Sequence, residues 1–194
     1  MSDFGARLRN VLEPVLAAAD PREKISAYHD MPYAIFHYDP RQELALRREV
    51  SSLRTRLENK GKRITSISLA ECLEAALKAE ASLEEWCEQE RLFGEHGAQK
   101  VVDDIHKLLA DRVPLVDLVA ERMPSEPDPR KDVVFIVRTG ALFPVYRTFS
   151  LLEQLKGRVV VPTVLFYPGD LDGAAGLRFM GVLQAEHNYR PKIF

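Results

Sequence analysis

Several polar side chains in this sequence stand directly after short apolar runs, where a ligand-binding edge would form. In an open α/β sheet, ligands bind beyond the carboxyl ends of the strands. If each run is one strand of a parallel sheet, the residues that follow the runs share one edge of that sheet. The ligand-crevice candidates are therefore Asp39, Ser68, Arg138, Thr139, Gly140 and Asp170.

The stretch Arg138-Thr139-Gly140 opens a segment with helical spacing. Helix N-termini attract anions, so one hypothesis is a nucleotide- or nucleic-acid-binding domain. The stretch has one glycine, however, and the chain lacks both GxxxxGK[ST] and GxGxxG. Two simpler roles account for the same residues: Thr139 caps the helix, and Arg138 pairs with a carboxylate such as Asp170.

Three aspartates, Asp39, Asp170 and Asp172, suggest a metal-dependent phosphodiesterase as a second hypothesis, because carboxylates hold divalent cations. Asp39 precedes Pro40 and a helical segment, and an N-cap is its simpler role, as it is for Ser68. Asp170 and Asp172 lie among glycines, where turn chemistry is the simpler interpretation. We expect no metal and no cofactor.

Catalytic constellations are missing from the sequence. No histidine has a metal-like i, i+4 partner, and no serine stands in a GxSxG context. Cys72 and Cys87 lack the basic or histidine neighbour that marks a nucleophile. The motifs therefore predict that the chain is not an enzyme.

Arginines cluster on the segment Arg41–Asn59, which has the spacing of an amphipathic helix. Glutamates are interleaved, so a solvated, salt-bridged face is the simpler interpretation. A partner-docking surface is the alternative, because arginine is enriched in protein interfaces. The partner-binding candidates are Arg47 and Arg54, with Trp86 as either an interface anchor or, more simply, a core residue.

Two apolar runs, Val133–Val137 and Val159–Tyr167, bracket the helix-spaced segment Leu142–Leu155. Strand, helix and strand in this order predict a βαβ unit with a right-handed crossover. Met31–Tyr38 and Ile64–Leu69 bracket the arginine-rich helix in the same way. The sequence predicts one three-layer α/β domain over residues 1–194, with a mainly parallel sheet of four or five strands.

Residues 70–124 carry only helical signals, with a capping box at Ser82 and Glu85. This length exceeds a plain crossover, so we expect a helical insertion within the domain. Asp170–Gly176 is typical of a loop. Leu177–Met180 and Tyr189–Phe194 are candidates for short edge strands.

Hydrophobic content, net charge and cysteine count indicate which broad classes of protein the chain fits. The 194 residues are 46% hydrophobic, with a net charge of −2 and a pI near 6.2. The hydrophobic content argues against disorder, and the net charge predicts no bulk attraction for nucleic acid, which leaves a local basic patch open. Two cysteines, no signal-peptide pattern and no apolar run of about 20 residues indicate a cytoplasmic protein without a membrane span.

The order of specific segments resembles one known family. Y-A-I-F-H-Y-D-P at 33–40, R-T-G-A-L-F-P at 138–144, V-P-T-V-L-F-Y-P-G at 161–169 and N-Y-R-P-K-I-F at 188–194 resemble the BrxB family. That family is a small component of BREX bacteriophage-exclusion systems. The resemblance covers about residues 30–194.

The resemblance implies a cytoplasmic defence protein that works in a multi-protein machine with PglZ, a methyltransferase and a large ATPase. It further implies a non-catalytic adaptor with a PglZ-like protein as its direct partner. It supplies no catalytic residues to place on this sequence, and it does not say which surface binds.

Overall fold

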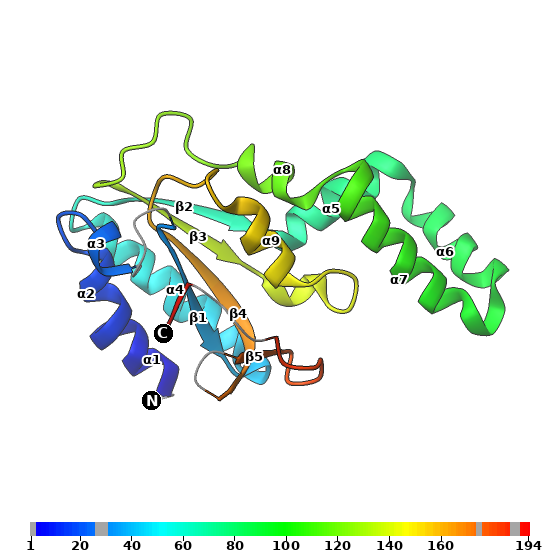
Figure 1. Cartoon of the computed structure of the whole chain (residues 1–194), viewed down its shortest axis with the longest axis horizontal. Coiled ribbons are helices and arrows are strands. Elements are labelled where there is room, and N and C mark those ends of the chain that lie inside the picture. The colour runs from blue at the N-terminus through cyan, green and yellow to red at the C-terminus, as the bar shows by residue number, and fades with distance from the viewer. Residues whose placement is uncertain (1–2, 26–30, 174–175, 187–190) are drawn as a thin grey trace.

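The computed structural model describes residues 3–25, 31–173, 176–186 and 191–194. Its core is a twisted, mainly parallel sheet (Figure 1), which confirms the predicted α/β class. Five strands are parallel in the order β2-β3-β4-β1-β6, and β5 pairs antiparallel with the end of β4. The strands are β1 Tyr33–Tyr38, β2 Arg63–Ser68, β3 Asp132–Val137, β4 Thr163–Asp172, β5 Gly176–Phe179 and β6 Lys192–Ile193.

Helices cover both faces of the sheet and complete the three layers. On one face, Phe36, Phe135 and Phe166 pack under the N-terminal helices and the arginine-rich helix. On the other, alternate residues of the same strands pack under a second helical layer. The first layer is α1 Asp3–Arg7, a π-helical turn Leu8–Leu12, α2 Glu13–Leu16, α3 Arg22–Ile25 and α4 Glu43–Glu58; the second is α5 Leu69–Glu80, α8 Leu115–Ala120 and α9 Thr148–Leu155.

The direction of the crossovers explains this division. From β1 the chain passes through α4 to β2, at the far side of β3 and β4. It then returns through α5–α8 to β3 and through α9 to β4, in the opposite direction across the sheet. Right-handed crossovers that run in opposite directions place their helices on opposite faces.

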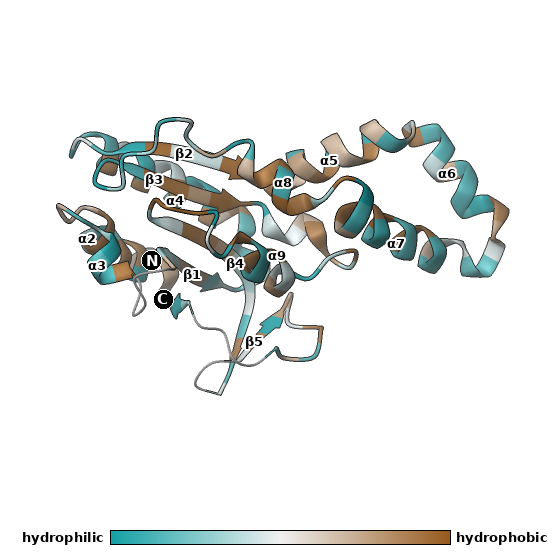
Figure 2. Cartoon of the chain, turned by 45° about the horizontal axis from the view of Figure 1, so that its top comes forward, coloured by the Kyte–Doolittle hydropathy of each residue, from teal (hydrophilic) through white to brown (hydrophobic). Residues whose placement is uncertain are grey.

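Helices α6 (Leu83–Leu92) and α7 (Gly97–Lys107) extend away from the sheet as an arm (Figure 1). They are largely hydrophilic, whereas the central strands are hydrophobic (Figure 2). The predicted capping box is confirmed: Ser82 Oγ accepts from Glu85 N at 3.2 Å, and Glu85 accepts from Ser82 N at 2.7 Å. At Gly97, an added Cβ would lie 1.8 Å from the carbonyl oxygen of Glu90, so the helices meet where only glycine fits.

The crossover between β3 and β4 differs from its prediction. Leu142 ends a 3-10 turn, Thr139–Leu142, and α9 begins only at Thr148. Phe143 is extended, at φ −78° and ψ 134°, because a residue before proline avoids the helical region. The segment Leu142–Leu155, predicted as one helix, is therefore the end of a turn, an extended stretch and the shorter helix α9.

The C-terminal segment also differs in detail. The predicted loop Asp170–Gly176 was wrong at its start, because β4 continues to Asp172 and pairs with β5. An added Cβ at Gly169 would lie 2.2 Å from the Arg178 carbonyl oxygen, so this pairing requires glycine there. Of the predicted strand Tyr189–Phe194, residues 189–190 lie outside the described residues, and β6 runs beside β1 as an edge strand.

Candidate functional site

A cavity of about 320 Å³ lies between α4 and the carboxyl-terminal halves of β2 and β3. It occupies the edge of the sheet where the sequence places its ligand crevice. Residues of α4, β2, β3, β4, the start of α5 and the turn after β3 line it. Its lining is Glu43, Leu46, Arg47, Val50, Ser51, Arg54, Ser66, Ser68, Glu71, Val137, Arg138 and Phe166.

The cavity exists because of two serines on β2. In the sheet register, Ser66 stands beside Phe135 and Ser68 beside Val137. Alternate residues of a strand share a face, so both serines face the α4 layer at positions where the neighbouring strand carries large apolar side chains. Small serine side chains leave the space beneath α4 unfilled, and Ser66 stays exposed in the middle of a strand.

Two arginines reach the cavity from α4. Arg47 Nε donates to Glu43 Oε1 at 2.8 Å, and Arg54 Nε donates to Glu58 Oε1 at 2.8 Å. Their side chains are 44% and 48% exposed, so these pairs contribute little to stability. The pairing favours the salt-bridged interpretation of this face, and its role in partner binding stays a prediction.

A buried tyrosine holds Glu43 at the cavity wall. The Tyr38 hydroxyl donates to Glu43 Oε2. Burial, and then this hydrogen bond, raises the pKa of Tyr38 well above its usual range. Tyr38 is therefore a neutral donor at physiological pH, and the Glu43 carboxylate is shared between Tyr38 and Arg47.

Arg138 stands where the cavity meets a second hollow. Its backbone is left-handed, at φ 59° and ψ 32°, which costs a non-glycine residue about 1 kcal/mol. Its side chain is exposed, and within the described part of the chain its guanidinium makes no hydrogen bond or ion pair. The second hollow, about 270 Å³, is lined by Pro40, Glu43, Arg47, Arg138, Gly140, Ala141, Pro168 and Met180.

The structure brings some predicted site residues together and not others. Ser68 and Arg138 line the cavity with Arg47 and Arg54, although the sequence placed the arginines of α4 on a separate surface. Gly140 lines the second hollow. Thr139 is fully buried, and its hydroxyl has no hydrogen-bond partner among the described residues.

The simpler capping roles hold for two candidates. Asp39 Oδ1 accepts from the Arg41 backbone N–H at 2.9 Å, and Ser68 Oγ accepts from Glu71 N at 3.3 Å. Asp172 pairs with Arg178 at 3.3 Å on the β4–β5 hairpin. Asp170 lies opposite Arg178 in the same hairpin, and no ion pair joins it to Arg138 in the described ranges.

Metal ligands do not gather in the described part of the chain. Over residues 3–25, 31–173, 176–186 and 191–194, no group of three or more His, Cys, Asp or Glu side chains is placed to hold an ion. His29 and His187 lie outside those ranges. No geometry that we observe therefore favours the phosphodiesterase hypothesis.

Trp86 packs inside the arm and is 6% exposed. Its indole Nε1 donates to the Leu77 carbonyl at 3.4 Å. It helps to line a groove of about 330 Å³ between α5, α6 and α7, with Leu77, Val101 and Ile105. This placement agrees with the core interpretation of Trp86.

Sequence reasoning missed Ser66 and Glu43 as parts of the site, whereas Glu71 follows the strand Ile64–Leu69 at the edge where a ligand was expected. One signal was available, since Ser66 and Ser68 interrupt the apolar face of a strand in a sheet that is covered on both sides. Recognising that signal as a cavity requires the identity of the neighbouring strand, which the sequence does not state.

Comparisons with known proteins agree on one family. The family model described as "BREX protein BrxB" matches residues 65–193. A protein of that name from Bacillus cereus (strain H3081.97) is 27% identical over 192 residues, which span 98% of this chain and 96% of the relative. No solved structure matched the chain. Among the helices of the described ranges, none is long and apolar enough to cross a bilayer.

Proposed function

The chain belongs to the BrxB family of BREX proteins, and from that premise we propose that it is a non-catalytic adaptor that binds a PglZ-like component of a phage-defence system. Membership supports an accessory role in phage defence. The direct partner, the absence of catalysis and a cytoplasmic location are parts of the proposal.

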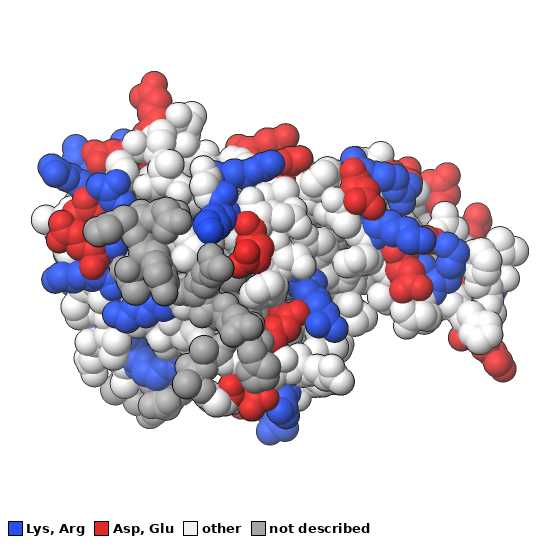
Figure 3. All heavy atoms as spheres, in the orientation of Figure 1, with Lys and Arg blue, Asp and Glu red and all other residues white. Residues whose placement is uncertain are grey.

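Exposed apolar side chains on the arm carry this proposal. Leu83 is 76% exposed, Leu92 is 80% exposed and Phe93 is 45% exposed, all on or next to α6. In the view of Figure 3, charged residues of both signs lie along the middle of the arm, and a white stretch nearer its far end is followed by acidic side chains at the tip. Apolar anchors within a polar surround are typical of protein-binding surfaces.

The geometry of the arm suits docking at a distance from the sheet. Trp86 and Gly97 hold α6 and α7 together, so the apolar side chains stand on a preformed scaffold. A rigid surface loses less conformational entropy on binding than a flexible loop. We therefore place the PglZ-like partner on the arm, and the cavity under α4 remains open to another ligand.

A pull-down from cells that carry the neighbouring operon tests this function. We expect the tagged wild-type chain to recover the PglZ-like protein in near-equal amount. The double variant Leu83→Ser/Leu92→Ser removes the two most exposed of the three apolar side chains and should reduce that recovery at least about tenfold, since each buried leucine contributes about 1.5–3 kcal/mol.

Val182→Ser is the matched control, because Val182 is an apolar residue of similar exposure, 71%, outside the arm. It should leave recovery unchanged. Recovery of the wild-type chain without the PglZ-like protein would contradict the adaptor function. Full recovery by the double variant would contradict the arm as its surface.

A further inference from the structure

We propose that the cavity between α4, β2 and β3 is a binding site for a mononucleotide. The proposal does not depend on the adaptor function, because it concerns a different surface from the arm. It rests on the size of the cavity and on the three kinds of side chain that line it: arginines, groups with hydroxyl or carboxylate oxygens, and apolar residues.

The dimensions and position are those of a small-molecule site. A volume of about 320 Å³ lies at the lower end of the range for ligand pockets, roughly 300–1,000 Å³. The adjoining hollow of about 270 Å³ shares Glu43, Arg47 and Arg138 with it. Two adjoining spaces at the carboxyl edge of a parallel sheet, with three lining residues in common, can hold the two ends of an elongated ligand.

Two guanidinium groups make the shared boundary suitable for a phosphate. Arg47 and Arg138 line both spaces, and Arg54 lines the larger one. Arginine binds phosphate oxygens with a planar pair of N–H donors. Glu43 pairs with Arg47, so Arg138 is the lining arginine that has no carboxylate partner within the described ranges.

The rest of the larger cavity suits a nucleoside. Ser66 and Ser51 offer hydroxyl groups, and Glu71 offers an exposed carboxylate that can accept from ribose hydroxyls, as acidic residues do in dinucleotide sites. Leu46, Val50, Val137 and Phe166 add apolar surface for a base. Inorganic phosphate would use the arginines alone and leave this surface in water.

The backbone of Arg138 gives an independent reason to assign a ligand here. A left-handed arginine is unfavourable where glycine would be free of strain, and its guanidinium has no partner within the described ranges to compensate. Strained residues cluster at ligand-binding sites, where the geometry serves the bound state. A phosphate at the shared boundary would supply the missing partner.

Isothermal calorimetry on the purified full chain tests the proposal. The probes are AMP, ADP, ATP and GMP, with adenosine and ribose 5-phosphate as fragments that lack the phosphate and the base. We expect saturable binding of at least one nucleotide at one site. We expect each fragment to bind at least about tenfold more weakly.

Arg138→Gly removes the guanidinium and relieves the left-handed strain, so its Tm should equal or exceed that of the wild type. Loss of a charged hydrogen bond should weaken nucleotide binding about 10- to 100-fold. Arg158→Ala is the matched control, because Arg158 is 50% exposed, pairs with Asp117 and does not line the cavity.

A second variant tests the space rather than the charge. Ser66→Phe places beside Phe135 a side chain that fills the cavity, and it should abolish binding while every arginine remains. Absence of nucleotide binding at millimolar concentration would overturn the proposal. So would unchanged affinity in Arg138→Gly, or ribose 5-phosphate binding as tightly as the nucleotides, which would indicate an anion site only.

Discussion

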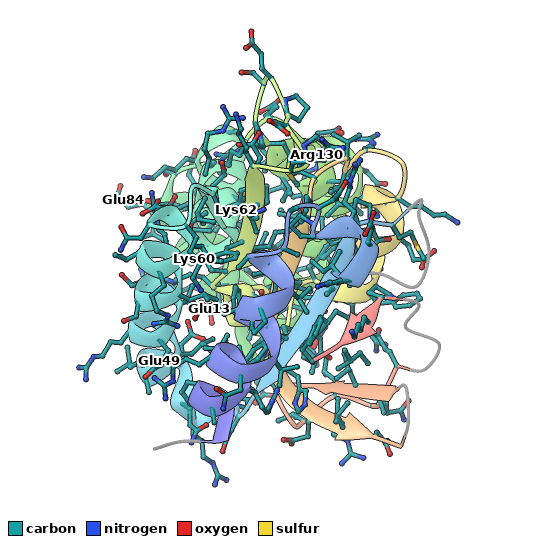
Figure 4. The ribbon with its side chains drawn as sticks, turned by 90° about the vertical axis from the view of Figure 1, so that its left-hand side faces the viewer. Glu13, Glu49, Lys60, Lys62, Glu84 and Arg130 are labelled. Carbon is teal, nitrogen blue, oxygen red and sulfur yellow. The ribbon has the colours of Figure 1, made fainter. Side chains whose placement is uncertain are left out.

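Glu13→Gln is expected to lower the free energy of unfolding by about 2 kcal/mol at pH 7, the range for hydrogen bonds to charged groups. Glu13 is 9% exposed and accepts from Arg56 Nε at 2.7 Å and from Lys60 Nζ at 2.6 Å. Figure 4 shows Glu13 on α2 facing the carboxyl end of α4, where Lys60 lies. These two ion pairs join α2 to α4 and to the residues just after it, so their loss should loosen the packing of the N-terminal helices on α4.

The effect should depend on pH in a defined direction. Burial alone would raise the pKa of Glu13, but hydrogen bonds from Lys60 and Arg56 outweigh it and hold that pKa below its usual value. A carboxyl whose pKa is lowered by folding stabilises the fold above its unfolded pKa, and that stabilisation disappears as pH falls through the folded pKa. The difference between wild type and Glu13→Gln should therefore shrink below about pH 4.5.

Thermal unfolding from pH 3 to pH 8 measures this difference, and about 2 kcal/mol corresponds to roughly 4–8 °C in Tm for a chain of this size. Glu49→Gln is the matched control on the same helix interface. Glu49 pairs with Arg9 at 3.4 Å and is 30% exposed, so its loss should change stability by less than about 1 kcal/mol. Equal effects of the two variants would contradict a special role for Glu13.

Gly97→Ala is expected to separate α6 from α7 and to unfold the arm locally. The new Cβ would lie 1.8 Å from the Glu90 carbonyl oxygen and 2.7 Å from its carbon. Backbone atoms cannot yield as a flexible side chain does, so the helices must move apart. Overpacking of this kind costs typically about 1–3 kcal/mol.

Trp86 makes this change measurable, because it is the one tryptophan in the chain and packs in the groove between α5, α6 and α7. In Gly97→Ala its fluorescence should shift to longer wavelength, while the unfolding of the sheet, followed by circular dichroism, changes little. The same variant should weaken recovery of the PglZ-like partner if the arm is the docking surface.

Gly5→Ala provides the opposite expectation at another helical glycine. An added Cβ there would make only ordinary contacts, 3.6 Å from Arg9 Nη2 and from Glu49 Cδ. Alanine in a helix is more favourable than glycine by roughly 0.5–1 kcal/mol, so this variant should be slightly more stable. Identical behaviour of the two alanine variants would show that the approach at Gly97 is not restrictive.

The sequence alone determined the fold class, because local hydrophobic periods carry that information. Runs such as Val133–Val137, apolar on both faces, suit only a covered strand, and their alternation with helical spacing leaves few topologies. The capping box at Ser82 and the caps at Asp39 and Ser68 are also local, since each involves residues at most three positions apart. The family resemblance rested on segments of the same local kind.

Tertiary structure alone decided which side chains share a site. Ser66 becomes a cavity residue only because β3 places Phe135 beside it and α4 covers both, and Arg47 meets Arg138 only across that space. The strand order depends on pairing between residues far apart in the chain, such as Ser66 beside Phe135, and Glu13 meets Lys60 in the same way. The crossing of α6 and α7 depends on the approach of Gly97 to the Glu90 carbonyl. The spacing of hydrophobic residues predicts which residues are buried. Only the tertiary structure determines which other residues they pack against.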